Sequence, residues 1–284
     1  MATPFTSDGA VDFSRAQELA SHLLQNGSSG LVVCGTTGES ATLSHDEKLQ
    51  LFRAVKEAAG EFPVIANTGS YDTAASVQLS REAQSIGVAA ILGVVPYYNR
   101  PSQEGLYQHF KAMAGSVELP LILYNLPGRT ARNMEVATTA RLSEIPNVIG
   151  TKEASGDLAQ VARTVSLTPE NFLIYSGNDA DTLPMLTLGA CGVISVISHL
   201  AGKQMRAMME AFWDGDMQTA REIHLRLLPV VDALFPASTS SPSPLKAGLQ
   251  MQGMDCGGLR LPLVEADEGE KTKLRSAMET AGLL

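Results

Sequence analysis

The sequence predicts an α/β fold, a (β/α)8 TIM barrel with a C-terminal helical extension. Short apolar runs typical of buried parallel strands alternate with amphipathic helical segments as far as residue 196. The chain has 284 residues, which suits one barrel of about 250 residues with added helices. A doubly wound open sheet is the alternative, and it is less favoured because no GxGxxG motif follows an early strand.

Apolar runs of strand length supply the first half of this pattern. Each run is short, nearly continuous and rich in Val, Ile and Leu, as expected for strands buried on both faces. Residues 1–4 would supply only the end of a further strand, so the first strand is expected to be truncated by about five residues. The seven complete runs are residues 31–34, 64–66, 89–95, 121–124, 148–151, 172–175 and 192–196.

Segments with helical periodicity supply the second half of the alternating strand and helix pattern. Residues 13–25 and 45–59 each place apolar side chains on one stripe, and Ser44 followed by Glu47 is a capping-box signature. After residue 196 the strand pattern stops. We therefore expect a catalytic barrel over residues 1–212 and a helical extension over 213–284. The expected late helices are 199–213, which closes the barrel, and 217–235, 244–252 and 269–281.

Composition excludes several classes of protein. Hydrophobic residues make up 44% and charged residues 18%, which argues against disorder, and no apolar stretch of about 18 residues predicts a membrane span. A formal charge of −9 opposes nucleic-acid binding. No signal peptide is visible, and Cys34 and Cys191 lie in apolar runs, so we expect buried, reduced thiols in a cytoplasmic protein.

Lys152 is the strongest candidate for a catalytic residue. It follows the apolar run 148–151, at the carboxyl end of a strand, where barrel active sites lie. A free lysine has a pKa of about 10.4, and desolvation frees its amine to attack a carbonyl and form a Schiff base. The alternative is a lysine that reaches solvent or pairs with Glu153, and on this feature alone the two interpretations are equal.

Three hydroxyl groups shift the balance toward catalysis. Tyr124 ends the neighbouring strand and is placed to pass protons to and from a substrate on Lys152. Thr37 and Tyr98 follow other strands and would extend this into a relay. Each tyrosine taken alone is more often a packing residue.

Two further features suit an anionic substrate. The turn 35–38, Gly-Thr-Thr-Gly, offers backbone N–H groups and hydroxyls to a carboxylate. Arg129 follows Pro127-Gly128 and would clamp a second carboxylate, although an isolated arginine is more often a surface residue. No metal site is expected, since the five histidines lack metal-ligand spacing. Residues 178–181, Asn-Asp-Ala-Asp, suit either a cation or, more readily, a helix N-terminus.

In combination, these segments resemble the dihydrodipicolinate synthase family of the N-acetylneuraminate lyase superfamily. The resemblance covers essentially the whole chain and rests on the ordered set 35–40, 97–101, 102–107, 124–129, 152–154 and 259–262. It implies a lyase that condenses pyruvate with aspartate 4-semialdehyde in lysine and diaminopimelate biosynthesis. It also implies no metal or organic cofactor and a homotetramer built as a dimer of dimers.

The resemblance also implies residue roles. Lys152 would form the imine with pyruvate, and Tyr98 would complete the proton relay across a dimer interface. Arg129 would receive the carboxylate of the semialdehyde. The remaining implied roles are relay for Tyr124 and Thr37, pyruvate carboxylate binding for Thr36 and Thr37, and backbone lining of the site for Gly177 and Ile194.

Family members inhibited by lysine use a pocket at the dimer interface. Regulated bacterial members often carry His, Asn and Glu where this chain has Lys48, Tyr71 and Ala75, so the carboxylate that would pair with the effector is missing. We expect weak or absent lysine inhibition. The matching positions are Ser40, Ala41, His45, Lys48, Tyr71, Ala75 and Tyr97. A second departure, Ser241 in place of the family's Asn before Pro242, concerns local loop structure more than catalysis.

Three other functions compete with the synthase. A sister aldolase acting on a sialic or sugar-derived keto acid shares the lysine and tyrosine, and Arg129 disfavours it. A catalytically silent paralogue is disfavoured by the intact Lys152 and Tyr124. A phosphate-binding isomerase barrel is the most distant, because no Gly-rich phosphate loop follows residue 196.

Overall fold

The structure is a computed structural model that describes residues 1–284. It contains two compact units. Residues Val64–Ser195 form one, called here the central unit. Residues Met1–Pro63 and Val196–Leu284 form the other, called here the terminal unit.

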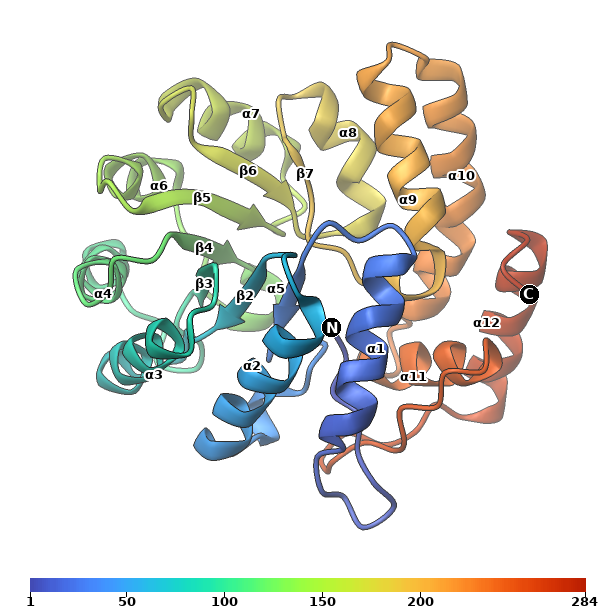
Figure 1. The fold of residues 1–284 in the computed structure, drawn as a ribbon. Helices are drawn as coiled ribbons and strands as arrows, with labels where there is room; N and C mark the ends of the chain where they lie inside the picture. Colours follow the sequence, from blue (N-terminus) through green and yellow to red (C-terminus); the bar gives the residue numbers. More distant parts are fainter. The chain divides into compact units, whose positions relative to one another are not determined.

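The central unit is built on a parallel sheet whose strands follow one another in chain order (Figure 1). A helix connects each strand to the next, as a sheet of parallel strands requires. The strands are β2 Val64–Asn67, β3 Ala90–Val94, β4 Leu121–Asn125, β5 Val148–Glu153, β6 Leu173–Ser176 and β7 Gly192–Val193. The helices are α3 Thr73–Ile86, α4 Gln103–Ala114, α5 Pro127–Thr130, α6 Val136–Ser143, α7 Leu158–Leu167 and α8 Thr182–Thr187, with the 3-10 turn η2 at Asp179–Asp181.

Six of the predicted strands lie in this sheet, and their ends differ from the prediction in an informative way. β4 and β5 continue into Asn125 and Glu153, beyond the predicted ends at 124 and 151. Lys152 therefore lies within β5 rather than after it. β7 ends at Val193 although the apolar run continues to 196, so hydrophobicity alone overestimated this strand.

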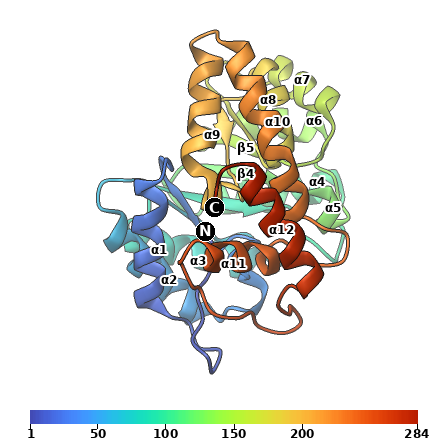
Figure 2. The ribbon, with the colours of Figure 1, turned by 90° about the vertical axis from the view of Figure 1, so that its right-hand side faces the viewer.

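The terminal unit contains the remaining predicted strand and the late helices. Both predicted early helices have the predicted bounds, and the capping box of Ser44 and Glu47 is present. Figure 2 shows α9 beside α10, and these helices contact each other, as do α11 and α12. The elements are α1 Phe13–Gln25, β1 Leu31–Val33, η1 Ser40–Thr42, α2 His45–Ala59, α9 Ser198–Trp213, α10 Met217–Leu234, α11 Pro242–Met251 and α12 Glu268–Thr280.

The opening residues form no regular strand. Phe5 makes a single antiparallel bridge with Val11, and the amino group of Met1 donates to the carbonyl of Val32 in β1 at 2.5 Å. The expected truncated first strand is thus limited to isolated contacts. The boundary between residues 212 and 213 stays a prediction.

Two smaller predictions have different outcomes. No helix is long and apolar enough to cross a membrane. Cys34 is buried as predicted, whereas Cys191 is only partly buried, so the prediction for Cys191 is wrong. Cys191 precedes the two-residue strand β7, where the sheet covers less of it, and its Sγ contacts the carbonyl of Ile174 at 3.4 Å.

Candidate active site

Lys152 and Tyr124 are brought together by the pairing of β4 with β5. The two residues are direct partners in the parallel register, so their side chains lie on the same face of the sheet. The Lys152 amine lies 4.4 Å from the centre of the Tyr124 ring. Lys152 is 9% exposed and Tyr124 is 5% exposed. This is the arrangement that an amine nucleophile beside a proton-transfer group requires.

The alternative in which Lys152 pairs with Glu153 is not what the structure contains. The Glu153 carboxylate accepts hydrogen bonds from Asn125, Ser155 and Gln160. Successive side chains of a strand point to opposite faces, so Glu153 is directed away from the face that carries Lys152. Lys152 also remains nearly covered, which does not fit a lysine that extends into solvent.

Gly177 and Ile194 follow β6 and β7. Their backbone N–H groups bond the carbonyls of Glu153 at 2.7 Å and Ser176 at 2.9 Å, which continues the sheet pattern past the strand ends. A Cβ atom on Gly177 would lie 3.2 Å from the Lys152 Cε and 2.7 Å from the Ala154 Cβ. Only glycine therefore lets the chain pass this close to the lysine.

Arg129 lies in the short helix α5, directly after β4. It is exposed, whereas the following residue, Thr130, is buried and donates through its hydroxyl to the carbonyls of Leu126 and Arg132. A second arginine supports the segment, since the Arg100 guanidinium donates to the carbonyl of Ala131 at 3.2 Å. The guanidinium of Arg129 is thus carried on a short, internally bonded segment that begins where Tyr124 and its strand end.

Tyr98 projects outward from the loop that follows β3. It has a left-handed backbone, with φ of 71°, and its side chain is 92% exposed. The neighbouring Tyr97 packs edge-on against Tyr71, with ring centroids 5.3 Å apart, and burial raises the pKa of Tyr97. The contact of Tyr98 with a second chain stays a prediction.

Thr36 and Thr37 lie in the terminal unit, in a tight turn after β1. Within the turn, Gly38 N donates to Gly35 O at 3.1 Å and Glu39 N donates to Thr36 O at 3.0 Å. The Thr3 hydroxyl donates to Gly38 O at 2.7 Å. Because this turn and Lys152 belong to different units, the approach of Thr36 and Thr37 to the lysine stays a prediction.

Sequence reasoning missed how Glu39, the residue after this turn, is held. Glu39 has a left-handed backbone, with φ of 55°, and its side chain is fully buried. Its carboxylate pairs with the Lys246 amine at 2.8 Å and accepts from the Arg260 backbone N–H at 3.1 Å. Arg260 in turn forms two hydrogen bonds with Glu47, at 2.6 and 2.9 Å, and these hold the pKa of Glu47 down at about 2. The C-terminal segments thus anchor the Gly-Thr-Thr-Gly turn.

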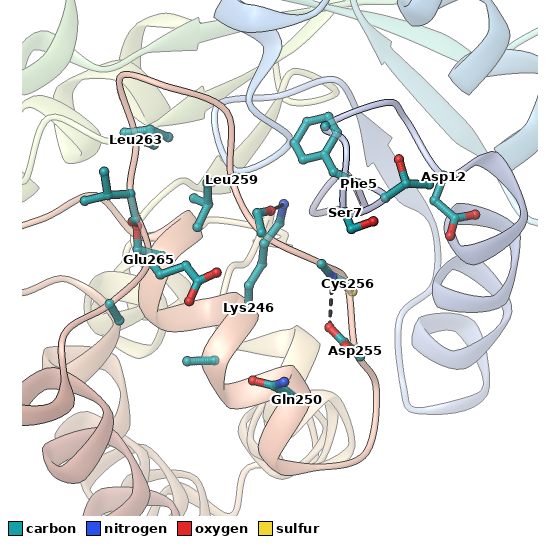
Figure 3. A pocket seen from close by; sticks show the side chains of 18 of the residues that line it. Phe5, Ser7, Asp12, Lys246, Gln250, Asp255, Cys256, Leu259, Leu263 and Glu265 are labelled. Carbon is teal, nitrogen blue, oxygen red and sulfur yellow. Dashed lines mark hydrogen bonds between the residues drawn. The ribbon is translucent and has the colours of Figure 1, made fainter.

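A polar cavity of about 780 Å³ lies in the terminal unit, beside Lys246 (Figure 3). It is bounded by the N-terminal segment, α11 and the loop that follows α11. Asp12, Asp255 and Glu265 share its wall with Arg15 and Lys271, so charges of both signs line it. No predicted site residue lines this cavity.

A comparison with known protein families identifies the chain's relatives. The model of the "Dihydrodipicolinate synthetase family" matches residues 1–281. The chain belongs to this family. A 4-hydroxy-tetrahydrodipicolinate synthase of Moorella thermoacetica is 55% identical over 100% of this chain and 97% of the relative. That of Bacillus subtilis is 50% identical over 98% of this chain and 96% of the relative.

Solved structures of dihydrodipicolinate synthases have the same fold. The Bacillus anthracis structure superposes with a TM-score of 0.96 at 46% identity, over 98% of this chain and 95% of that one. The Cyanidioschyzon merolae structure, described as having lysine bound, gives 0.97 at 44% identity, over 100% of this chain and 97% of that one. The predicted (β/α)8 barrel with C-terminal helices is confirmed, as are the predicted family and enzyme class.

The positions matching the family's lysine pocket fall in both units. Ser40, Ala41, His45 and Lys48 belong to the terminal unit, and Tyr71, Ala75 and Tyr97 belong to the central unit. Burial lowers the pKa of Lys48, with Cys34 opposing. The prediction that this dihydrodipicolinate synthetase family member responds weakly or not at all to lysine remains open to measurement.

The acidic stretch after β6, residues 178–181, forms a hydrogen bond within itself. The Asn178 side chain donates to Asp181 at 2.8 Å, and Asp179 is buried at the start of η2. No group of three or more His, Cys, Asp or Glu side chains is arranged to hold a metal ion. The stretch forms the 3-10 turn η2 with the expected acidic first turn, but neither Asn178 nor Asp181 caps a helix through its side chain, so the N-cap part of the favoured interpretation is wrong.

Proposed function

We propose that Lys152 carries the synthase reaction, in which pyruvate condenses with aspartate 4-semialdehyde to give 4-hydroxy-tetrahydrodipicolinate. The activity is that of the full-length relatives and serves lysine and diaminopimelate biosynthesis. The observation that carries the residue assignment is the pairing of Lys152 with Tyr124 on one buried face, with the amine 4.4 Å from the ring.

The chemistry follows from the lysine amine. Its attack on the keto carbon of pyruvate, with loss of one water, gives an imine, and loss of a methyl proton then gives an enamine. The enamine carbon bonds to the aldehyde carbon of the second substrate. Attack by that substrate's own amino group closes the ring and returns the free lysine, so the net reaction releases one water. Tyr124 is the group beside Lys152 able to move these protons.

Local groups capture the substrates against an unfavourable overall charge. Pyruvate is an anion, the semialdehyde is a zwitterion with one carboxylate, and the chain carries a net charge of −9, so long-range attraction does not concentrate either substrate. In this proposal Arg129 receives the semialdehyde carboxylate, and the hydroxyls and N–H groups of Thr36 and Thr37 hold that of pyruvate. Gly177 and Ile194 line the site through their backbones. The reaction uses no added cofactor.

Tyr98 supports an assembly of more than one chain. Its 92% exposed ring supports a role as a relay group given to a second chain, within a homotetramer built as a dimer of dimers. One solved relative, 40% identical, is described as a monomeric variant, so the state of this chain needs direct measurement by ultracentrifugation. We place the protein in the cytoplasm, in keeping with its class of biosynthetic enzyme.

Borohydride reduction in the presence of pyruvate tests the proposal. Peptide mapping is expected to find a reduced pyruvate adduct on Lys152, and Lys152→Met should give no adduct and no turnover. A coupled assay with aspartate 4-semialdehyde should show condensation by the unmodified enzyme. Absence of the adduct from Lys152 would refute the mechanism. An adduct without condensation would instead favour a sister aldolase.

A further inference from the structure

Behind the reactive pair, on the opposite face of the same two strands, lies a second pair of side chains. Asn125 follows Tyr124, Glu153 follows Lys152, and the two are direct partners in the β4–β5 register. Alternation along a strand turns both away from the lysine face. Asn125 is completely buried and Glu153 is 5% exposed. A carboxylate is rarely buried to this degree unless its oxygens are fully bonded.

Every bond to the Glu153 carboxylate comes from an N–H group. Asn125 Nδ2 lies 3.1 Å from both oxygens, the Ser155 backbone N–H lies 2.8 Å from Oε1, and Gln160 Nε2 lies 3.3 Å from Oε2. Burial raises the pKa of Glu153, and these hydrogen bonds act against that rise. The carboxylate is therefore an acceptor surrounded by donors from β4, the loop after β5 and α7.

The orientation of the Asn125 amide is fixed by its partners. The backbone N–H of Met134 is only a donor and lies 2.9 Å from Oδ1, so Nδ2 faces Glu153 and also donates to Asn133 Oδ1 at 2.8 Å. Asn133 and Gln160 exchange two further bonds, at 2.8 and 3.2 Å. One connected set thus joins the end of β4, the start of α6 and the first turn of α7.

This network closes the loop that carries Arg129. Asn125 stands directly before the loop and Asn133 at its far end, and their amides are bonded to each other. The Glu153 carbonyl also accepts from Gly177 N at 2.7 Å, which ties the same residue to the glycine beside Lys152. The carboxylate thus holds one end of the loop directly, at Asn125, and reaches the other end through Asn125 and Gln160, which both bond Asn133.

We infer that Glu153 is a positioning residue for the second substrate: its buried carboxylate, acting through Asn125 and Asn133, fixes the Arg129 loop relative to Lys152. The inference rests on the proposed roles of Lys152 and Arg129. A misplacement of about 1 Å in a positioning element costs up to about 100-fold in rate, so the effect is measurable.

Glu153→Gln is the direct test, because it replaces one acceptor oxygen with an N–H₂ group, which then faces the Asn125 donor together with that of either Ser155 or Gln160. We expect the KM for aspartate 4-semialdehyde to rise about tenfold or more. The rate of pyruvate trapping at Lys152 by borohydride should stay within about twofold of the unchanged enzyme, since the lysine face is untouched. A variant that only lost stability would change the reaction with both substrates alike.

The matched control is Asn147→Asp, an amide and acid exchange at the opposite end of the strands. Asn147 Nδ2 donates to the carbonyls of Ala114, Val117 and Leu119 at 2.9, 3.1 and 3.2 Å, so its replacement lowers stability at a distance from the strand ends that carry the site. It should lower the melting temperature and leave both KM values unchanged. The same KM shift in this control would overturn the inference.

Rescue provides the second test. In Glu153→Gln with Gln160→Glu, the amide and the carboxylate exchange places, while Asn125 still donates to Asn133 and the Asn133 amide still has an acceptor at residue 160, so the KM for the semialdehyde should return toward its original value. Unchanged KM values in folded Glu153→Gln, or equal losses for both substrates, would overturn the inference. Should that variant not fold, Gln160→Met, which removes the 3.3 Å contact, should raise the same KM about two- to fivefold, and no rise would count equally against it. Failure of pyruvate trapping in the unchanged enzyme would instead refute the proposed function.

Discussion

Replacement of Lys246 by methionine should destabilise the protein far more than its single charge suggests. The Lys246 side chain is 4% exposed and its partner Glu39 is 0% exposed, with 2.8 Å between the charged atoms. Lys246 also donates to Gly258 O at 2.6 Å and lies 4.4 Å above the ring of Phe5. Burial lowers the pKa of Lys246 and Glu39 opposes that change, so neither partner is stable there without the other.

The expected loss of unfolding free energy comes from the buried Glu39 carboxylate that loses its partner. Lys246→Met keeps the length of the side chain but leaves the Glu39 carboxylate buried without its cation, still accepting from the Arg260 backbone N–H at 3.1 Å. Breaking a buried ion pair on one side costs about 3–5 kcal/mol of unfolding free energy. Urea denaturation at a fixed protein concentration, followed by circular dichroism, would measure it.

Two further variants make the reasoning refutable. Lys271→Met breaks a pair of similar length, 3.0 Å, whose partners are 32% and 90% exposed, and it should cost no more than about 1 kcal/mol. Glu39→Gln combined with Lys246→Met leaves no buried charge and should regain most of the lost stability. If Lys246→Met loses no more than Lys271→Met, the argument from burial is wrong.

Three other predictions follow from single features. Gly177→Ala should lower kcat about tenfold or more, because the new methyl group lies 3.2 Å from the Lys152 Cε, and a steady-state assay that finds normal kcat would contradict this. Burial lowers the pKa of His199 to about 3, while an unfolded histidine has a pKa of about 6.5. The contribution of neutral His199 to the unfolding free energy is therefore complete above about pH 6.5 and is lost as the pH falls from about 6.5 to 3. His199→Gln should flatten the pH dependence of unfolding free energy in that window, and an unchanged slope would exclude the assignment. Free lysine at sub-millimolar concentration should not inhibit the purified enzyme, because Lys48 and Ala75 offer the effector's ammonium no carboxylate, and inhibition there would contradict the prediction.

The sequence predicted the framework well because a buried parallel strand and an amphipathic helix have clear periodicities. It also placed Tyr124 beside Lys152, since consecutive apolar runs become neighbouring strands. The polar ends of strands are harder to interpret. Asn125 and Glu153 resemble loop residues in a sequence, and Glu153 was weighed only as a partner for Lys152, yet both are buried strand residues facing the other way.

Contacts between distant segments were not predictable at all. Nothing in the residues around Glu39 indicates that Lys246 and the backbone of Arg260 lie against it. A charged residue in a glycine-rich turn is ordinarily assigned to the surface. Such pairs depend on how the C-terminal helices fold back within the terminal unit, and no local periodicity encodes that.

The closed loop after β4 has a consequence for how new specificities arise in this fold. Its two end residues, Asn125 and Asn133, are locked together, whereas Arg129 between them is exposed. If the proposed roles hold, residues 126–132 can be exchanged as a unit, which would alter the choice of second substrate while Lys152 keeps its surroundings. Transplants that retain both asparagines and Glu153 should fold and still trap pyruvate. Transplants that lose any of the three should not hold a defined second-substrate preference.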